Sequence, residues 1–192
     1  MTLSRVDTAR LRLRPFTLDD IDAYHRAIFS DPDVMRYLPG GKPLPVERVR
    51  LMINRVRAHW AEHGYGLWAV ELRGEGTLIG HCGLQNLPDA PEVELAYGIA
   101  RPYWGRGLVT EAARASVRFG FEHAQLDHII AVAVPEHAAS RRVMEKIGMV
   151  YDGTGTYYGT ELVRYVLRRA DYRQPAAPYT LTELPERAQP ER

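Results

Sequence analysis

The sequence predicts a mixed α/β (α+β) fold, in which a mostly antiparallel sheet of six or seven strands carries helices on both faces. Extended apolar segments and amphipathic helical segments both recur along the chain. In its second half, a strand, a helix and a second strand follow each other closely enough to form a central βαβ unit, whose two strands are parallel. With 192 residues, 45% of them hydrophobic, the chain is long enough for one sizeable core.

We expect a single domain over residues 1–172, followed by a mobile tail. Residues 173–192 are rich in proline and charged residues, and such a composition provides little apolar surface to bury. No internal repeat divides the chain.

The first half of the chain predicts one strand and two helices. Residues 9–16 alternate leucine with arginine, the period-two pattern of a half-buried strand. Residues 17–30 begin with a capping-box sequence and continue with apolar residues at helical spacing. Residues 45–63 carry a long apolar stripe, and Gly64 is expected to end this helix.

Three extended runs follow, at residues 66–72, 77–85 and 93–100. Turn-rich segments that contain glycine, proline, asparagine and aspartate separate them. The three runs therefore predict an antiparallel meander.

The remaining elements complete the βαβ unit and the sheet. We expect a helix over 108–123, a β-branched strand over 129–134 and a helix over 136–147. The final strands are expected at 149–158 and 161–168.

Composition and charge exclude several classes of function. The formal net charge is +1, so the chain lacks the one-signed surface that non-specific binding to nucleic acid requires. The single cysteine, Cys82, excludes an intramolecular disulfide and a multi-cysteine zinc site. No apolar run approaches the roughly 18 residues of a membrane span. We therefore expect a cytoplasmic protein that binds neither nucleic acid nor a membrane.

A glycine turn lies where the third strand of the meander gives way to a helix. Gly105 and Gly107 flank Arg106, and the N–H groups at the start of the following helix have no partner within it. Such a turn can bind an anion. The lysine of a nucleoside-triphosphate loop is absent, and Thr110 stands where a dinucleotide fingerprint has its third glycine. An ordinary turn that uses glycine for its positive φ remains the alternative.

Three blocks of sequence give a more specific indication. They read ARLRLRPFTLDD at 9–20, VELAYGIARPYWGRGLVTEA at 93–112 and HAASRRVMEKIGM at 137–149. In their order and spacing, over about residues 8–172, they resemble the GNAT superfamily of N-acetyltransferases, and within it the RimJ/RimL-like branch. The resemblance implies a GNAT-like sheet with a cofactor-binding βαβ unit, acetyl-CoA as co-substrate, no metal, and an amine as acceptor.

The resemblance also implies where the cofactor binds. The amides of the glycine turn would hold the diphosphate of coenzyme A, and the strand at 93–100 would splay from the one at 129–134 to admit the pantetheine arm. Pro102 stands where the family usually has glutamine or arginine, and His137 where it usually has asparagine. The cofactor contacts that we expect are Ile99, Arg101, Arg106, Gly107, Leu108, Val109, Thr110, His137 and Ser140.

Attack on a thioester requires a neutral amine, so a base is expected near the acyl carbon. Reference pKa values of about 8 for an α-amine and about 10.4 for a lysine mean that a mild base suffices for the α-amine. Glu94 matches the position of a catalytic glutamate in the family. On a regular strand Glu92 shares its face and Tyr97 lies on the opposite one. Ser140 matches a position that often contacts the sulfur of coenzyme A.

Other hydroxyl groups could assist the departing thiol, and the sequence does not rank them. They belong to Tyr103, Tyr151, Tyr157 and Tyr158.

Direct transfer in a ternary complex is favoured over an acetyl-cysteine route. Cys82 is expected to be a buried apolar residue, and His81 would point to the other face of the same strand. The segment HWAEH at 59–63 fits an inverted zinc-protease pattern, but Trp60 lies on the apolar stripe, which favours an ordinary helix end.

Several functions remain open at this level. The acceptor is either a protein N-terminal α-amine or a small amine such as an antibiotic, a polyamine or an amino acid. A non-catalytic acyl-CoA-binding module is the alternative from another class. A homodimer is common among proteins of this kind.

Overall fold

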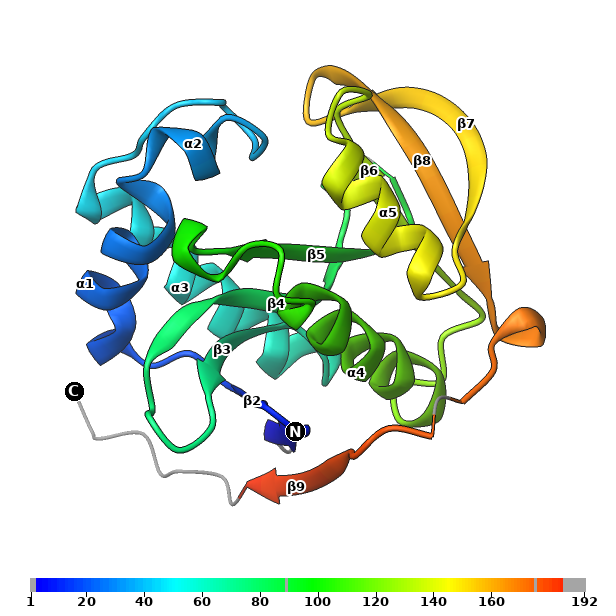
Figure 1. Ribbon diagram of the computed structural model, residues 1–192, viewed down its shortest axis with the longest axis horizontal. Coiled ribbons are helices and arrows are strands. Elements are labelled where there is room, and N and C mark those ends of the chain that lie inside the picture. The colour runs from blue at the N-terminus through cyan, green and yellow to red at the C-terminus, as the bar shows by residue number, and fades with distance from the viewer. Residues whose placement is uncertain (1–2, 89, 175, 185–192) are drawn as a thin grey trace.

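The computed structural model describes residues 3–88, 90–174 and 176–184, in which nine strands form one mixed sheet (Figure 1). The strand order is β7-β8-β6-β5-β4-β3-β2-β1-β9, and the pairing of β5 with β6 is parallel. The other pairings are antiparallel. The strands are β1 (Leu3–Asp7), β2 (Leu11–Arg14), β3 (Leu67–Leu72), β4 (Leu78–Asn86), β5 (Val93–Ile99), β6 (His128–Ala133), β7 (Val150–Tyr157), β8 (Thr160–Arg168) and β9 (Thr180–Leu184).

The three long helices lie within two residues of their predicted bounds. A glycine at φ 72° ends the first of them, where Gly64 donates its N–H to the carbonyl oxygen of Trp60. The helices are α1 (Ile21–Tyr24), α2 (Pro32–Met35), α3 (Val46–His63), α4 (Leu108–Glu122) and α5 (Ala138–Lys146).

The helix predicted over residues 17–30 is divided into three turns. A 3-10 turn at Leu18–Asp20 precedes α1, and a π-helical turn at His25–Phe29 follows it. The expected capping interaction is present, because the N–H of Thr17 donates to the Asp20 carboxylate at 2.7 Å.

The prediction of six or seven strands is wrong in number, because β1 and β9 were not expected. In β1 the buried positions are Ser4 and Val6, so a serine at a core position hides the apolar alternation. The buried Ser4 carbonyl accepts a hydrogen bond from the indole of Trp68 at 2.7 Å. β9 lies in the segment rich in proline and charge, and its stability depends on pairing with β1 from end to end.

This pairing involves part of the expected tail. Residues 180–184 form the edge strand β9, which pairs with β1. Residues 185–192, the rest of the expected tail, lie outside the described residues.

Helices cover both faces of the central part of the sheet. Trp68 and Val70 of β3 join the core beneath α4, whereas Leu67 and Ala69 of the same strand join the core beneath α1 and α3. Figure 1 shows α4 and α5 in front of the sheet and α3 behind it. In the part of the chain that the structure describes, no helix is long and apolar enough to cross a membrane.

Candidate active site

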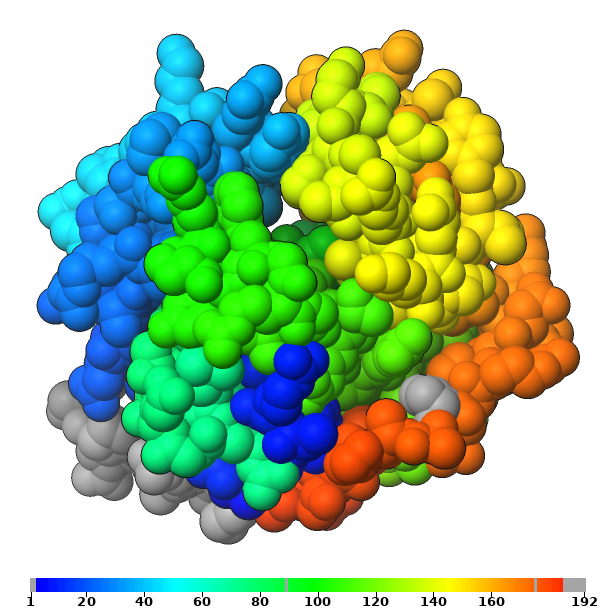
Figure 2. Space-filling model, in the orientation of Figure 1, coloured from blue at the N-terminus to red at the C-terminus, as the bar shows by residue number. Residues whose placement is uncertain are grey.

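The two parallel strands at the centre of the sheet meet at one point. β5 and β6 share the single register pair Glu94 and Ile130, whereas β5 pairs with β4 from Val93 to Ile99. The strands therefore separate toward their carboxyl ends, as the resemblance implies. Figure 2 shows a hollow between the surfaces of α2 and α5, bordered below by the green segment that follows β5.

The glycine turn connects β5 to α4 at the edge of this hollow. Gly105 and Gly107 have φ values of 71° and 73°, the left-handed region that glycine enters without strain. The N–H of Glu111 donates to the Gly107 carbonyl at 3.1 Å, which starts the hydrogen-bond ladder of α4. The preceding amides, of Leu108, Val109 and Thr110, have no partner within the helix and lie at the positive end of its dipole.

Backbone at this turn is open to close approach. A Cβ atom added to Gly107 would meet one atom within 4 Å, the Nη2 of Arg10 at 3.7 Å. The side chain of Leu108 is buried in the core, and those of Val109 and Thr110 are half-buried. The turn therefore offers main-chain donors rather than a wall of side chains, which suits a diphosphate.

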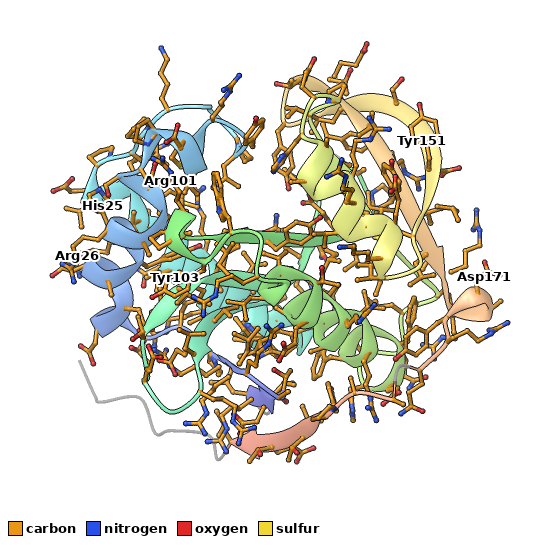
Figure 3. The ribbon with its side chains drawn as sticks, viewed as in Figure 1. His25, Arg26, Arg101, Tyr103, Tyr151 and Asp171 are labelled. Atoms are coloured by element: carbon orange, nitrogen blue, oxygen red, sulfur yellow. The ribbon has the colours of Figure 1, made fainter. Side chains whose placement is uncertain are left out.

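The two arginines expected at the cofactor are placed differently. Arg101 forms an ion pair with Asp33 of α2 at 2.6 Å, and Figure 3 shows its side chain beside that helix. The guanidinium of Arg106 lies 5.5 Å from the centre of the Tyr103 ring, at the glycine turn itself. The structure thus holds Arg101 against α2 rather than at the turn, whereas Arg106 remains at the turn.

Ile99 lies at the end of β5, buried against the core under α4. Its carbonyl oxygen accepts a hydrogen bond from the indole of Trp104 at 2.7 Å, which folds the chain back before the glycine turn.

Glu94 is a buried carboxylate with two donors. Its side chain is 5% exposed, and its Oε2 accepts from the Tyr158 hydroxyl and, at 3.1 Å, from the Gln85 amide. The same amide donates to the Tyr158 hydroxyl at 3.0 Å. Burial raises the pKa of Glu94 above its ordinary value, whereas these two hydrogen bonds pull it down. A carboxyl group in this setting suits a general base near neutral pH.

Ser140 lies on α5 with its hydroxyl against a second tyrosine. The Ser140 Oγ and the Tyr97 hydroxyl are 2.9 Å apart, and the Tyr97 hydroxyl also donates to the Ser140 carbonyl at 3.2 Å. Burial raises the pKa of Tyr97, so its hydroxyl stays protonated. Tyr97 packs with the core under α4, whereas Ala96 packs with the core of the opposite face, which agrees with the predicted alternation.

His137 is engaged by a residue from the other side of the hollow. At the start of α5, its ring stacks on that of Tyr37 with the centroids 3.9 Å apart and the planes at 7°. Burial lowers the pKa of His137. Tyr37 follows α2, so this contact joins the two sides of the hollow.

The structure places two of the four candidate tyrosine hydroxyls differently. Tyr158 touches Glu94, whereas Tyr151 packs against Tyr165 and lies on β7 in Figure 3, away from the hollow.

The sequence did not predict the contact of Gln85 with Glu94 or that of Tyr37 with His137. Gln85 sits directly opposite Glu94 in the register of β4 and β5, a relation that emerges only once the hairpin register is known.

Cys82 is part of the core. Its Sγ lies 3.3 Å from the Ser116 hydroxyl, and burial raises the pKa of the thiol to about 12.

The histidines of the HWAEH segment make structural contacts, with His59 Nδ1 2.9 Å from the Tyr65 carbonyl. Within the described ranges, no cluster of histidine, cysteine, aspartate and glutamate could hold a metal ion.

Comparison with known proteins agrees with this geometry. The family model described as an acetyltransferase (GNAT) domain matches residues 10–150. The Bacillus subtilis protein YkkB is 35% identical over 153 residues, which cover 79% of this chain and 88% of that protein. The N-acetyltransferase YnaD of the same organism is 34% identical over 148 residues, 77% of this chain and 84% of the relative.

A solved structure gives the same result. The GNAT-family acetyltransferase from Bacillus anthracis has a TM-score of 0.72 at 30% identity and covers 88% of this chain and 99% of its own. The chain belongs to the GNAT family of acetyltransferases.

Proposed function

We propose that this protein transfers an acetyl group from acetyl-CoA to a primary amine by direct attack in a ternary complex. The observation that carries the proposal is the position of Glu94. A buried carboxylate with neutral donors lies at the only pairing point of β5 and β6, on the strand that leads into the glycine turn. A base and an anion-binding turn are thereby joined by one strand.

The resemblance implies the cofactor-holding residues, and the open backbone of the turn supports them. The main-chain donors of Arg106, Gly107, Leu108, Val109 and Thr110 would hold the diphosphate, because helix starts favour anions. Acetyl-CoA supplies the activated acyl group when bound. Ile99, Arg101, His137 and Ser140 remain expected contacts along the rest of the cofactor.

Two groups of this chain would handle the protons. Glu94 takes a proton from the acceptor ammonium, and the neutral amine then forms a bond to the acyl carbon while the bond from that carbon to sulfur breaks. The nitrogen loses its second proton to the departing thiolate, so the products are the amide and the free thiol. The hydroxyls of Ser140 and Tyr97 would stabilise the departing sulfur by hydrogen bonding. A thiol near pKa 8.5 leaves near neutral pH with little need for a stronger acid.

The acceptor that suits this base best is an α-amine. Glu94 is a mild base even with its pKa raised, and an α-amine of pKa about 8 gives up its proton far more readily than a lysine at about 10.4. The resemblance of the three sequence blocks to the RimJ/RimL-like branch supports the same acceptor.

A covalent acetyl-cysteine is not part of the proposal. Cys82 is 1% exposed and its thiol, at a pKa of about 12, is not ionised near neutral pH.

The test measures release of the coenzyme A thiol from acetyl-CoA with a panel of amines. The panel contains a peptide with a free α-amine, the same peptide with its N-terminus blocked, a polyamine and an aminoglycoside. We expect Glu94→Gln to lower turnover by about 10²–10⁴-fold, the usual share of a general base, with the affinity for coenzyme A retained.

The matched control is Glu92→Gln. Glu92 lies just before β5 and pairs with Arg164 rather than with Tyr158 or Gln85, so turnover should persist. Unchanged turnover in Glu94→Gln would remove Glu94 from the mechanism. Binding of coenzyme A without thiol release against every amine would make the protein a binding module.

A further inference from the structure

An arginine from the start of the chain reaches the glycine turn. Arg10 lies in the connection between β1 and β2, and its Nη1 donates to the main-chain carbonyl of Arg106 at 2.9 Å. The two residues are 96 positions apart in sequence. This contact ties the N-terminal strands to the loop that we assign to the cofactor diphosphate.

Glu111 anchors the arginine. Its Oε2 accepts from the Arg10 Nε at 2.6 Å, and its Oε1 accepts from the Arg10 N–H at 2.8 Å and from the Thr8 hydroxyl at 2.7 Å. These hydrogen bonds and the charge of Arg10 hold the pKa of Glu111 below its ordinary value against the opposing effect of burial. We call Thr8, Arg10 and Glu111 the Arg10 clamp.

The loop that carries Thr8 and Arg10 is itself fixed. Arg73 donates its N–H to the Arg10 carbonyl at 2.9 Å and its Nη1 to the Thr8 carbonyl at 2.6 Å. The guanidinium of Arg10 is thus presented from a supported backbone, although half of its side chain is exposed.

The consequence of the Arg106 contact follows from peptide geometry. A carbonyl oxygen and the N–H of the next residue lie in one plane and point in opposite directions when the peptide is trans, and the structure records no cis peptide among the described residues. Fixing the Arg106 oxygen toward Arg10 therefore turns the N–H of Gly107 away from the clamp. Without that contact the peptide could rotate, because glycine at this position permits both signs of φ.

The clamp also removes a charge conflict. Glu111 lies in the first turn of α4, where its negative charge would repel a diphosphate held by the same helix start. Pairing with Arg10 offsets that charge.

We propose that Arg10 is a positioning residue for the cofactor, which acts by holding the peptide group between Arg106 and Gly107 in the orientation that binds the diphosphate. The inference rests on the proposed acetyl-CoA site. It assigns to the β1–β2 connection a role in cofactor affinity and none in the proton transfer at Glu94.

The test compares Arg10→Met with the wild-type protein by calorimetric titration with coenzyme A and by steady-state kinetics. Loss of a charged hydrogen bond and of the fixed amide should raise the Kd of coenzyme A and the KM of acetyl-CoA about tenfold. Turnover at saturating acetyl-CoA should stay within about twofold, because Glu94 and its donors are untouched.

Arg12→Met is the matched control. It removes the same charge from the neighbouring strand, but Arg12 pairs with Asp7 and not with the glycine turn, so cofactor affinity should persist. A melting temperature within a few degrees of wild type confirms that Arg10→Met is folded.

Glu111→Gln separates positioning from simple attraction between Arg10 and the phosphates. A positioning role predicts weaker binding, because Arg10 loses its anchor, whereas direct attraction predicts tighter binding, because a negative charge is gone. Tighter binding in Glu111→Gln, or unchanged affinity in Arg10→Met, overturns the inference. Failure of the wild type to bind coenzyme A would instead overturn the proposed function.

Discussion

At the scale of one residue, two opposing effects set the pKa of Glu94, the candidate base. Burial disfavours the carboxylate, and the hydrogen bonds from Tyr158 and Gln85 favour it. Tyr158 occupies the tight turn between β7 and β8 at a φ of 53°, so that hairpin delivers the hydroxyl to Glu94. The protonation of this carboxyl therefore depends on the neighbouring strand β4 and on a turn 64 positions away in sequence.

The first prediction concerns pH. A base works only when deprotonated, so kcat/KM should fall as the pH is lowered through the raised pKa of Glu94. Tyr158→Phe removes a donor that favours the carboxylate, which should raise that pKa further and move the acidic limb of the profile to higher pH. Steady-state rates between pH 5 and pH 9 give the comparison.

Tyr157→Phe is the control for this experiment. It alters the adjacent tyrosine of the same hairpin, which does not contact Glu94, so the acidic limb should stay in place. If the acidic limb also stays in place in Tyr158→Phe, or moves to lower pH, then the pKa of Glu94 does not determine the pH profile.

The glycine turn and the first turn of α4 act as a unit at the scale of the element. We predict that Gly107→Val lowers coenzyme A affinity at least about tenfold, because a β-branched residue at φ 73° strains the turn by roughly 1–2 kcal/mol and covers its amides. Calorimetric titration measures the affinity.

The control replaces a glycine that also has a positive φ but lies outside the site. Gly74→Val introduces the same side chain at φ 88° in the turn between β3 and β4, where an added Cβ meets nothing within 4 Å. Its affinity for coenzyme A should match the wild type. Equal losses in both variants would mean that general strain, and not the turn itself, explains the effect.

A second contact at this scale joins α5 to the segment after α2. Tyr37→Ala should expose the His137 ring and raise its pKa toward the ordinary value of about 6.5, because burial is what lowers it. NMR titration of the imidazole C–H signals measures this change. Tyr37→Phe keeps a ring over the histidine and should leave its pKa in place, so a rise in Tyr37→Phe of the same size would contradict the role of stacking.

At the scale of the whole molecule, the helices were more predictable than the sheet edges. The amphipathic pattern of α3 and α4 is a local property of the sequence, so their bounds could be predicted closely. β1 and β9 are stabilised by pairing with each other, and neither segment shows the alternation of a strand. The number of strands therefore could not be read from local patterns.

In the candidate site too, local sequence features could be predicted and contacts between distant residues could not. Glu94, Ser140 and the glycine turn could be named from short motifs. Their partners could not, because Tyr158 and Glu94 are 64 positions apart and Tyr97 and Ser140 are 43 apart. These residues come into contact only when the sheet and α5 have folded.

The last prediction tests whether the C-terminal segment belongs to the folded domain. A chain that ends at residue 173 lacks β9, which exposes the edge of β1 and removes Tyr179, over whose ring Arg118 lies at 4.2 Å. At 0.2–1 kcal/mol for each cross-strand pair, the free energy of unfolding should fall by about 2 kcal/mol and the melting temperature by several degrees. An exposed edge strand also favours self-association, which light scattering would detect.

A chain that ends at residue 184 is the matched control, since it keeps β9 and should melt as the full chain does. The glycine turn and Glu94 do not belong to β1 or β9. The chain that ends at residue 173 should therefore retain its turnover well below its melting temperature. If the chain that ends at 173 unfolds at the same temperature as the one that ends at 184, then β9 adds nothing to stability and the original expectation of a mobile tail is correct.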